Sequence, residues 1–225
     1  MLYLRGKGNT RFYNSSTGAT TFQLSERAGC YGNINVLLDY ENPFPETFSA
    51  GDTFYKLFYN CTNLISAPEL PTKKLVSGCY NNMFSGTSIV YAPELPAMNL
   101  ASSCYYQMFY RCKSLKVATE LPATILYGSC YSRMFYECSA LEQPPSKLPA
   151  TEARAECYYY MFVFCNSLKR MPKIYLTTLA DGCMYGMFFH CRTLPISTTK
   201  TGEYTIPWRF PAVGLIDESY SSTSN

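Results

Sequence analysis

Apolar and polar positions follow a regular pattern through most of this chain, and the segment CYYQMFYRC shows it well. The segment places Cys104, Met108, Phe109 and Cys112 at relative positions 0, 4, 5 and 8. We interpret this spacing as one face of a short α-helix whose apolar side turns inward. Tyr105 lies at the edge of the same face, so we expect it to pack in the core as well.

A different pattern follows each of these segments. After the second cysteine come Leu115, Ala118 and Leu121, and then Pro122. Apolar residues that end in a proline predict a short strand followed by a turn, because proline cannot continue the pairing of a sheet. One strand and one short helix per unit predict a parallel sheet on one side of the molecule and helices on the other.

The unit recurs six times along the chain. Its first residues are Thr53, Cys79, Cys104, Cys130, Cys157 and Cys183, at spacings of 26, 25, 26, 27 and 26 residues. The longest step comes from one extra residue between Leu141 and Leu148. A period in this range is typical of solenoids, in which units too small to bury their own apolar face stack on one another. The sequence therefore predicts an α/β solenoid of six strand-plus-short-helix units.

The two ends of the chain depart from this period. Residues 1–52 carry short alternating runs broken by glycines, and we interpret them as a β-rich N-terminal cap on a solenoid of residues 53–195. Residues 196–225 are interpreted as a C-terminal cap or docking tail. Their middle, YTIPWRFPAVGL, holds the single tryptophan, Trp208, which we expect to pack on the last repeat or on a partner.

The repeat resembles a known family. Phe109-x-x-Cys112-x-x-Leu115, followed by a Leu-Pro turn, is similar to the leucine-rich repeats of the BspA type. The motif recurs at Phe58, Cys61 and Leu64, at Phe135, Cys138 and Leu141, at Phe162, Cys165 and Leu168, and at Phe188, Cys191 and Leu194. Such repeats occur in bacterial surface adhesins, and the richer CYxxMF form is associated with gut Bacteroidales proteins and their phages. The resemblance implies a leucine-rich-repeat-like solenoid; the family shares no catalytic site, so it implies no functional residues.

Composition narrows the classes of function. The 225 residues are 47% hydrophobic, but no apolar run approaches the length that crosses a bilayer, so we expect one soluble unit without membrane insertion. The formal net charge is +3, from 19 basic and 16 acidic residues, without a polybasic block. This balance argues against nucleic acid as a partner. The start, MLYLRGKGNT, lacks the apolar core of a secretion signal, so we expect a mature fragment or a protein that leaves its cell by another route.

Most of the eleven cysteines occupy two repeat positions, eight residues apart. Thr53 accompanies Cys61 and Cys79 accompanies Thr87, so each column loses a cysteine independently of the other. Eight residues along a helix span about 12 Å, too far for a disulfide. We interpret the columns as ladders of buried thiols, with disulfides between repeats as the alternative. Zinc is disfavoured because structural zinc sites need closely spaced ligands and His190 is the only histidine.

A column of charge runs along the predicted strands. Glu69, Glu94 and Glu120 share one strand position in successive repeats, about 4.8 Å apart if the strands pair in register. We interpret these three residues as solvated carboxylates, with a site for calcium or for a cationic ligand as the alternative. A role as the acid–base pair of a glycosidase is disfavoured. Later repeats place basic residues on this face, namely Lys147, Lys169, Arg170 and Lys173. A surface with one acidic and one basic end suits oriented docking or self-assembly.

Aromatic residues form a second candidate surface. Tyr59, Tyr110 and Tyr136 share an outward position on the predicted helices. Such a stripe can contact sugars or fill pockets of a protein partner; alternatively, the tyrosines shield the helix edge.

These observations favour a non-catalytic recognition or assembly module over an enzyme. Nucleophilic catalysis usually needs a histidine base, and His190 is the single candidate. We expect a phage virion structural protein of a tail, fibre or capsid decoration, and hence a virion or extracellular location. The alternative is a bacterial cell-surface adhesin. The expected partners are a protein or surface glycan ligand and other virion subunits, without cofactor or metal, and the sequence permits a homo-oligomer.

Overall fold

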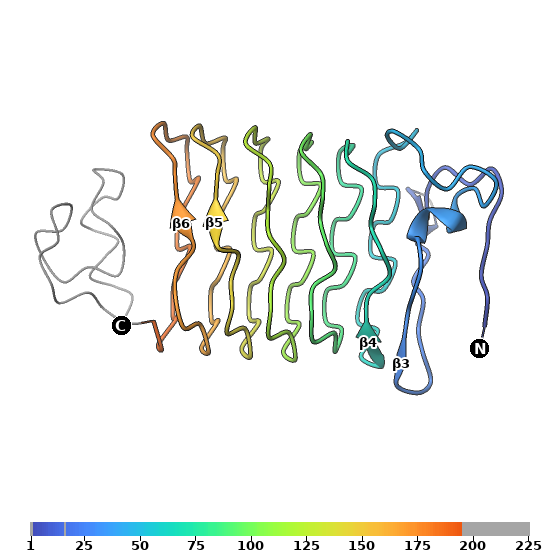
Figure 1. Ribbon diagram of the computed structural model, residues 1–225, viewed down its shortest axis with the longest axis horizontal. Coiled ribbons are helices and arrows are strands. Elements are labelled where there is room, and N and C mark those ends of the chain that lie inside the picture. The colour runs from blue at the N-terminus through green and yellow to red at the C-terminus, as the bar shows by residue number, and fades with distance from the viewer. Residues whose placement is uncertain (1, 16, 195–225) are drawn as a thin grey trace, which may run out of the picture.

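The computed structural model describes residues 2–15 and 17–194. The chain winds into coils that stack side by side along one axis, with one repeat in each coil (Figure 1). Backbone hydrogen bonds join equivalent parts of neighbouring coils: Phe54 N donates to Cys79 O at 2.8 Å, and Tyr105 N donates to Cys130 O at 3.1 Å. Each inner coil is therefore hydrogen-bonded to the coil before it and the coil after it.

One long side of each coil, here called the strand side, pairs with its neighbours in parallel. β3 (Ala28–Gly29) pairs with β4 (Leu64–Ser66), and β5 (Lys147–Leu148) pairs with β6 (Lys173–Ile174). Isolated parallel bridges, such as those that link Tyr91, Val117 and Gln143, continue the pairing between the other coils. The predicted parallel pairing is present, but as short contacts of a few residues.

The α-helix predicted over CYYQMFYRC is wrong. The residues described contain no α-helix, and this segment is a run of consecutive turns. Alternate amides close turns within the coil, as where Met108 N donates to Tyr105 O at 3.2 Å. The amides between them cross to the next coil, as where Phe109 N donates to Met134 O at 3.0 Å. Because half of the amides bond to a neighbouring coil, the i→i−4 ladder of an α-helix cannot form.

Every fourth residue of this segment has a positive φ. In the third coil these are Ser103, Gln107 and Arg111, with φ of 54°, 51° and 59°, and the same three positions have positive φ in all six repeats. For a residue other than glycine this conformation costs about 1–2 kcal/mol. It is held by bonds between coils, since Gln107 N donates to Ser132 O at 3.0 Å and Arg111 N to Tyr136 O at 2.8 Å.

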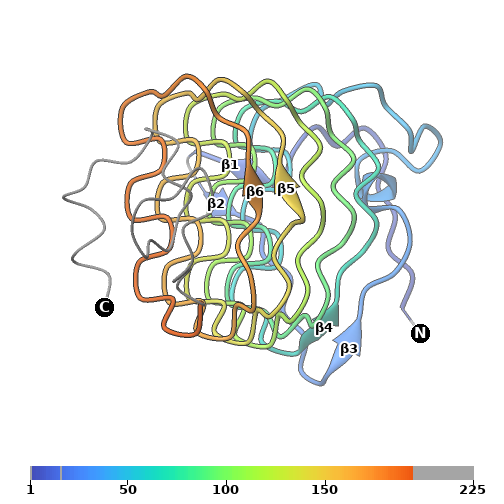
Figure 2. The same ribbon diagram turned by 60° about the vertical axis from the view of Figure 1, so that its left-hand side comes forward.

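These turns set which side chains face the core. We call the segment between the two cysteine columns of each coil, such as residues 104–112, the turn side; Figure 2 shows its stepped course. Its residues point inward in pairs, two in and two out. The predicted inward position of Met108 and Phe109 is confirmed, because both are fully buried, whereas Arg111 is exposed. Tyr105 is buried too, as predicted.

Inward aromatic residues of successive coils stack in two ladders. Their ring centroids lie 5.2–5.9 Å apart, and most pairs are nearly parallel. The first ladder is Phe54, Tyr80, Tyr105, Tyr131 and Tyr158, and the second is Phe58, Phe84, Phe109, Phe135, Phe162 and Phe188. Stacked aromatic pairs stabilise a fold beyond the area that they bury.

Both cysteine columns are buried, as predicted. Ten of the eleven cysteines are buried and Cys30 is half-buried. In the second column, Cys138 Sγ donates to Phe109 O of the preceding coil at 3.0 Å. Thr87, which replaces a cysteine there, donates its hydroxyl to Phe84 O at 2.9 Å. Threonine is also small and also donates to a core carbonyl, so each position can accept it independently.

The N-terminal segment covers the first coil. It contains the antiparallel hairpin of β1 (Tyr13–Asn14) and β2 (Gly18–Ala19) and a short 3₁₀ helix, η1 (Ile34–Leu37). Phe12 and Phe22 continue the two aromatic ladders, with ring centroids 5.8 Å from those of Phe54 and Phe58 respectively. Phe12 N and Phe22 N donate to carbonyls of the first coil at 2.8 and 2.7 Å. The predicted tail of residues 196–225, with Trp208, lies outside the described residues.

Candidate functional site

Outward rings on the turn side form a connected surface over the later coils. Tyr110 and Tyr136 stack with centroids 5.0 Å apart, and Tyr136 meets Phe164 edge to face at 6.1 Å. Phe164 stacks on His190 at 4.7 Å. Tyr159, Tyr160 and Tyr185 form a second group, which touches Tyr136 through Tyr160. We call these seven residues the aromatic surface.

Tyr59 is not part of this surface. The second coil has Ser85 at the repeat position that Tyr59 occupies in the first coil and Tyr110 in the third. The predicted stripe of Tyr59, Tyr110 and Tyr136 is therefore interrupted, and continuous ring contact begins at Tyr110. The sequence analysis did not group Tyr159, Tyr160 and Tyr185 with Tyr136, because these contacts join different coils and depend on how the coils stack.

Two arginines lie against the aromatic surface. Arg111 makes a two-pronged ion pair with Glu137, with Nε–Oε2 and Nη2–Oε1 distances of 3.0 and 3.2 Å, and this raises the pKa of Arg111. Its guanidinium also lies 5.1 Å from the centre of the Tyr110 ring. Arg133 lies 5.4 Å from the centre of the Tyr159 ring. The ion pair with Glu137 orients the Arg111 guanidinium, so a ligand would meet this side chain in a defined position.

The orientation of the rings limits what they can contact. Because Tyr110 and Tyr136 stack on each other with 18° between their planes, each ring covers one face of the other. Stacking leaves the second face, the edge and the hydroxyl group of each ring for other contacts. A sugar that stacks on tyrosine needs an open ring face, whereas a protein surface also uses ring edges and hydroxyl groups.

The acidic column lies on the strand side. Glu69, Glu94 and Glu120 are all exposed, and the bridge between Tyr91 and Val117 sets the register that aligns Glu94 with Glu120. The Glu120 carboxylate accepts bonds from the amide and hydroxyl of Ser146, at 2.8 and 2.7 Å. Ser146 lies where the fourth repeat has its extra residue, so the longer step supplies a partner for Glu120.

The basic residues of the strand side fall into two groups. Lys169 forms an ion pair with Glu142, which lowers the pKa of that carboxyl group. Arg170 donates to Pro144 O at 3.1 Å and to Pro145 O at 3.4 Å. Lys147 and Lys173 lie directly opposite each other in β5 and β6. Neither lysine forms an ion pair with any residue that the structure describes.

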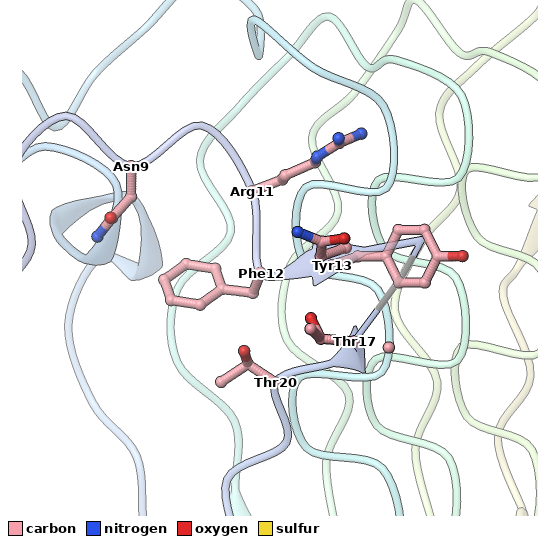
Figure 3. Close-up of a pocket in the computed structure, with 8 residues that line it drawn as sticks. Asn9, Arg11, Phe12, Tyr13, Thr17 and Thr20 are labelled. Carbon is pink, nitrogen blue, oxygen red and sulfur yellow. The ribbon is translucent and has the colours of Figure 1, made fainter.

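An open hollow of about 450 Å³ lies at the β1–β2 hairpin (Figure 3). Phe12 and Tyr13 leave the chain on opposite sides, as neighbours on a strand do. Arg11 is the only charged side chain among its lining residues, which include no carboxylate, histidine or cysteine. The hollow was not predicted, because its lining residues all lie between residues 9 and 20 and only the fold of the hairpin brings them together. Its lining offers no acid–base pair.

The buried thiols are poorly suited to chemistry. Burial raises the pKa values of Cys112 and Cys157 to about 11 each, so both are neutral at pH 7. A neutral thiol is a weak nucleophile and a weak metal ligand. Across residues 2–15 and 17–194, no group of three or more His, Cys, Asp or Glu residues is placed to hold a metal ion. Over the same residues, no helix is both long and apolar enough to span a bilayer.

No protein-family model, curated protein or solved structure matches this chain. The relation to BspA-type repeats therefore stays a prediction from the repeat motif.

Proposed function

We propose that this chain is a non-catalytic recognition module, a leucine-rich-repeat-like solenoid that binds a protein surface through its aromatic surface. The observation that carries the proposal is the division of the turn side into constant and variable positions. Inward positions repeat the same residue types, as Met108 and Phe109 do, in nearly every coil. Outward positions vary from coil to coil, and in the later coils they carry tyrosine, phenylalanine and arginine. These are residue types that dominate binding energy in protein interfaces.

The cysteines support a place on a phage virion. Ten of them are buried. Buried free thiols are typical of a protein that folds in a reducing compartment, whereas secreted proteins of bacteria usually form disulfides. A virion subunit folds in the cytosol of its host before it reaches the exterior. The proposed role is therefore that of a tail, fibre or capsid decoration protein that contacts the host surface or a neighbouring subunit.

Binding to whole cells tests the proposal. The full chain is immobilised and its binding to intact Bacteroidales cells is measured by biolayer interferometry. Changing both Tyr110 and Tyr136 to Ala should reduce binding at least about tenfold, because two central anchors are lost. Tyr127→Ala is the matched control, since Tyr127 is an exposed tyrosine outside the aromatic surface.

Treatment of the cells identifies the class of ligand. Protease treatment should abolish binding, and periodate oxidation of surface sugars should leave it unchanged. Binding that survives protease and disappears after periodate would mean that the ligand is a glycan. Equal binding by the double variant and the native chain would mean that the aromatic surface is not the recognition site.

A further inference from the structure

Two neighbouring columns of charge on the strand side are organised differently. In the first column, Lys116, Glu142 and Lys169 alternate in sign, and backbone bonds of 3.0 and 3.2 Å link their coils. Glu142 and Lys169 neutralise each other within the chain. We call this the alternating column.

In the second column, charges of one sign are grouped together. Glu69, Glu94 and Glu120 occupy successive coils, and Lys147 and Lys173 follow them. We call this the segregated column. Neighbouring side chains in it lie about 4.8 Å apart, and like charges directly opposite each other are destabilising. Glu120 is bonded to Ser146, whereas Glu94, Lys147 and Lys173 keep charges that no ion pair within the described residues neutralises. The acidic residues lie at one end of the row and the two lysines at the other.

We propose that two copies of this chain pair face to face through their strand sides, with their stacks antiparallel. The two-fold axis runs parallel to the strands, between the coil of Glu120 and the coil of Lys147. This operation places Glu120 opposite Lys147 of the second copy, and Glu94 opposite Lys173 of the second copy. Each contact occurs twice because the interface is isologous. Figure 1 shows β5 and β6 side by side on the face that takes part.

The same operation suits the neighbouring columns. It places Lys116 opposite Glu142 of the second copy, which adds a third pair of opposite charges. It also places Tyr91, whose exposed fraction is 68%, opposite Arg170 of the second copy, which suits a cation–π contact. Lys169 lies opposite Val90 of the second copy. No charged residue of these columns therefore lies opposite a residue of like charge.

The size of the face predicts a weak dimer. The proposed contacts involve the four coils that carry Glu94, Glu120, Lys147 and Lys173. With a spacing of about 4.8 Å and about ten residues each on the strand side, these coils cover about 600 Å² per copy. Stable specific interfaces cover about 800 Å² per partner. Association through this face should therefore depend on concentration and on salt. The turn side stays open in this arrangement, so the pairing goes beyond the proposed recognition function and is tested separately from it.

Sedimentation equilibrium of the full chain tests the pairing. At low salt we expect a monomer–dimer equilibrium, with a dissociation constant that rises at least about tenfold in about 0.5 M salt, where charges are screened beyond about 4–5 Å. Lys173→Glu should also raise the dissociation constant at least about tenfold, because it sets two pairs of like charges against each other.

Two further variants separate this pairing from a general effect of charge. Glu94→Lys combined with Lys173→Glu restores opposite charges at both contacts, so the dissociation constant should return to within about threefold of the native value. Lys113→Glu is the matched control: Lys113 is exposed and the charge change is the same, but Lys113 belongs to neither column of charge. It should leave the dissociation constant unchanged, and thermal melting should show that all the variants are folded.

Three results would overturn the proposal. The first is a chain that stays monomeric at low salt at every concentration. The second is a dimer that responds equally to Lys113→Glu and Lys173→Glu, or whose double variant is no tighter than the single one. The third is a dimer broken by Tyr110→Ala with Tyr136→Ala, which would place the second copy on the turn side. Loss of dimerisation with intact binding to cells would leave the recognition function standing.

Discussion

The turn side and the strand side of each coil meet the neighbouring coil in different ways. On the turn side, every second amide crosses to the next coil and every fourth residue has a positive φ. On the strand side, pairing is limited to stretches of two or three residues and isolated bridges. An inserted residue would break the period of four on the turn side, and none of the six repeats has one there. The strand side accepts one at Ser146, so the turn side fixes the register and the strand side adapts to it.

The largest effect should come from the core of the turn side. The Phe109 ring is fully buried between Phe84 and Phe135, with centroid distances of 5.8 and 5.5 Å. Phe109→Ala should lower the free energy of unfolding by about 3–5 kcal/mol, because it leaves a cavity between two coils. Urea denaturation measures the change. Arg111→Ala, at an outward position of the same coil, should stay within about 0.5 kcal/mol, and equal losses would contradict the inward and outward assignment.

The second largest effect should be a loss of folding stability at alkaline pH, where the buried thiols ionise. The unfolded thiol of Cys112 ionises near pH 8.5, whereas burial raises its pKa in the folded chain to about 11. Between these values the unfolded state releases a proton that the folded state keeps, so stability is full below about pH 8.5 and falls as pH rises toward 11. The free energy of unfolding that is lost through this one thiol approaches about 3 kcal/mol.

Threonine at the same position provides the control for this prediction. Cys112→Thr copies the residue found at Thr87 and removes the ionising group. The pH of half-unfolding, followed by circular dichroism, should therefore move upward in the variant relative to the native chain. A midpoint that does not move would mean that Cys112 does not set the alkaline limit.

A smaller effect should follow from one glycine of the turn side. Gly86 has a φ of 74°, and a Cβ there would lie too close to the Asn60 carboxamide oxygen. Gly86→Ala should cost about 1–2 kcal/mol in the free energy of unfolding. Gly128 lies just outside the turn side, and the nearest atom to its added Cβ is Ala155 O at 3.8 Å. Gly128→Ala should change stability by less than about 0.5 kcal/mol, and a larger loss there than at Gly86 would contradict the role assigned to positive φ.

The smallest effect should come from the insertion on the strand side. Ser146→Ala removes the hydroxyl bond to Glu120 and keeps the amide bond. Because the site is exposed, the free energy of unfolding should fall by less than about 1 kcal/mol, measured by thermal melting. A loss as large as that of Phe109→Ala would mean that the strand side also fixes the register.

The helix is the clearest point at which sequence reasoning failed. Inward residues at positions 0, 4, 5 and 8, with position 1 at the edge, fit a helical face, but they fit a strict period of four as well. The residues at the positive-φ positions of the second repeat are Gly78, Asn82 and Gly86. Glycine and asparagine tolerate the left-handed region best, so this spacing was the available signal for turns.

The sequence by itself determined which residues face the core and how long each coil is. Apolar residues recur at a fixed period along the chain. This period is visible in the sequence without knowledge of which residues of the neighbouring coils they contact. Only the tertiary structure decided between helix and turns, because half of the amides of the turn side find their acceptors one repeat away. It also decided which charges are neutralised. Lys169 reaches Glu142 while Lys147 faces Lys173, and these contacts depend on register between coils, which spacing along a single repeat does not contain.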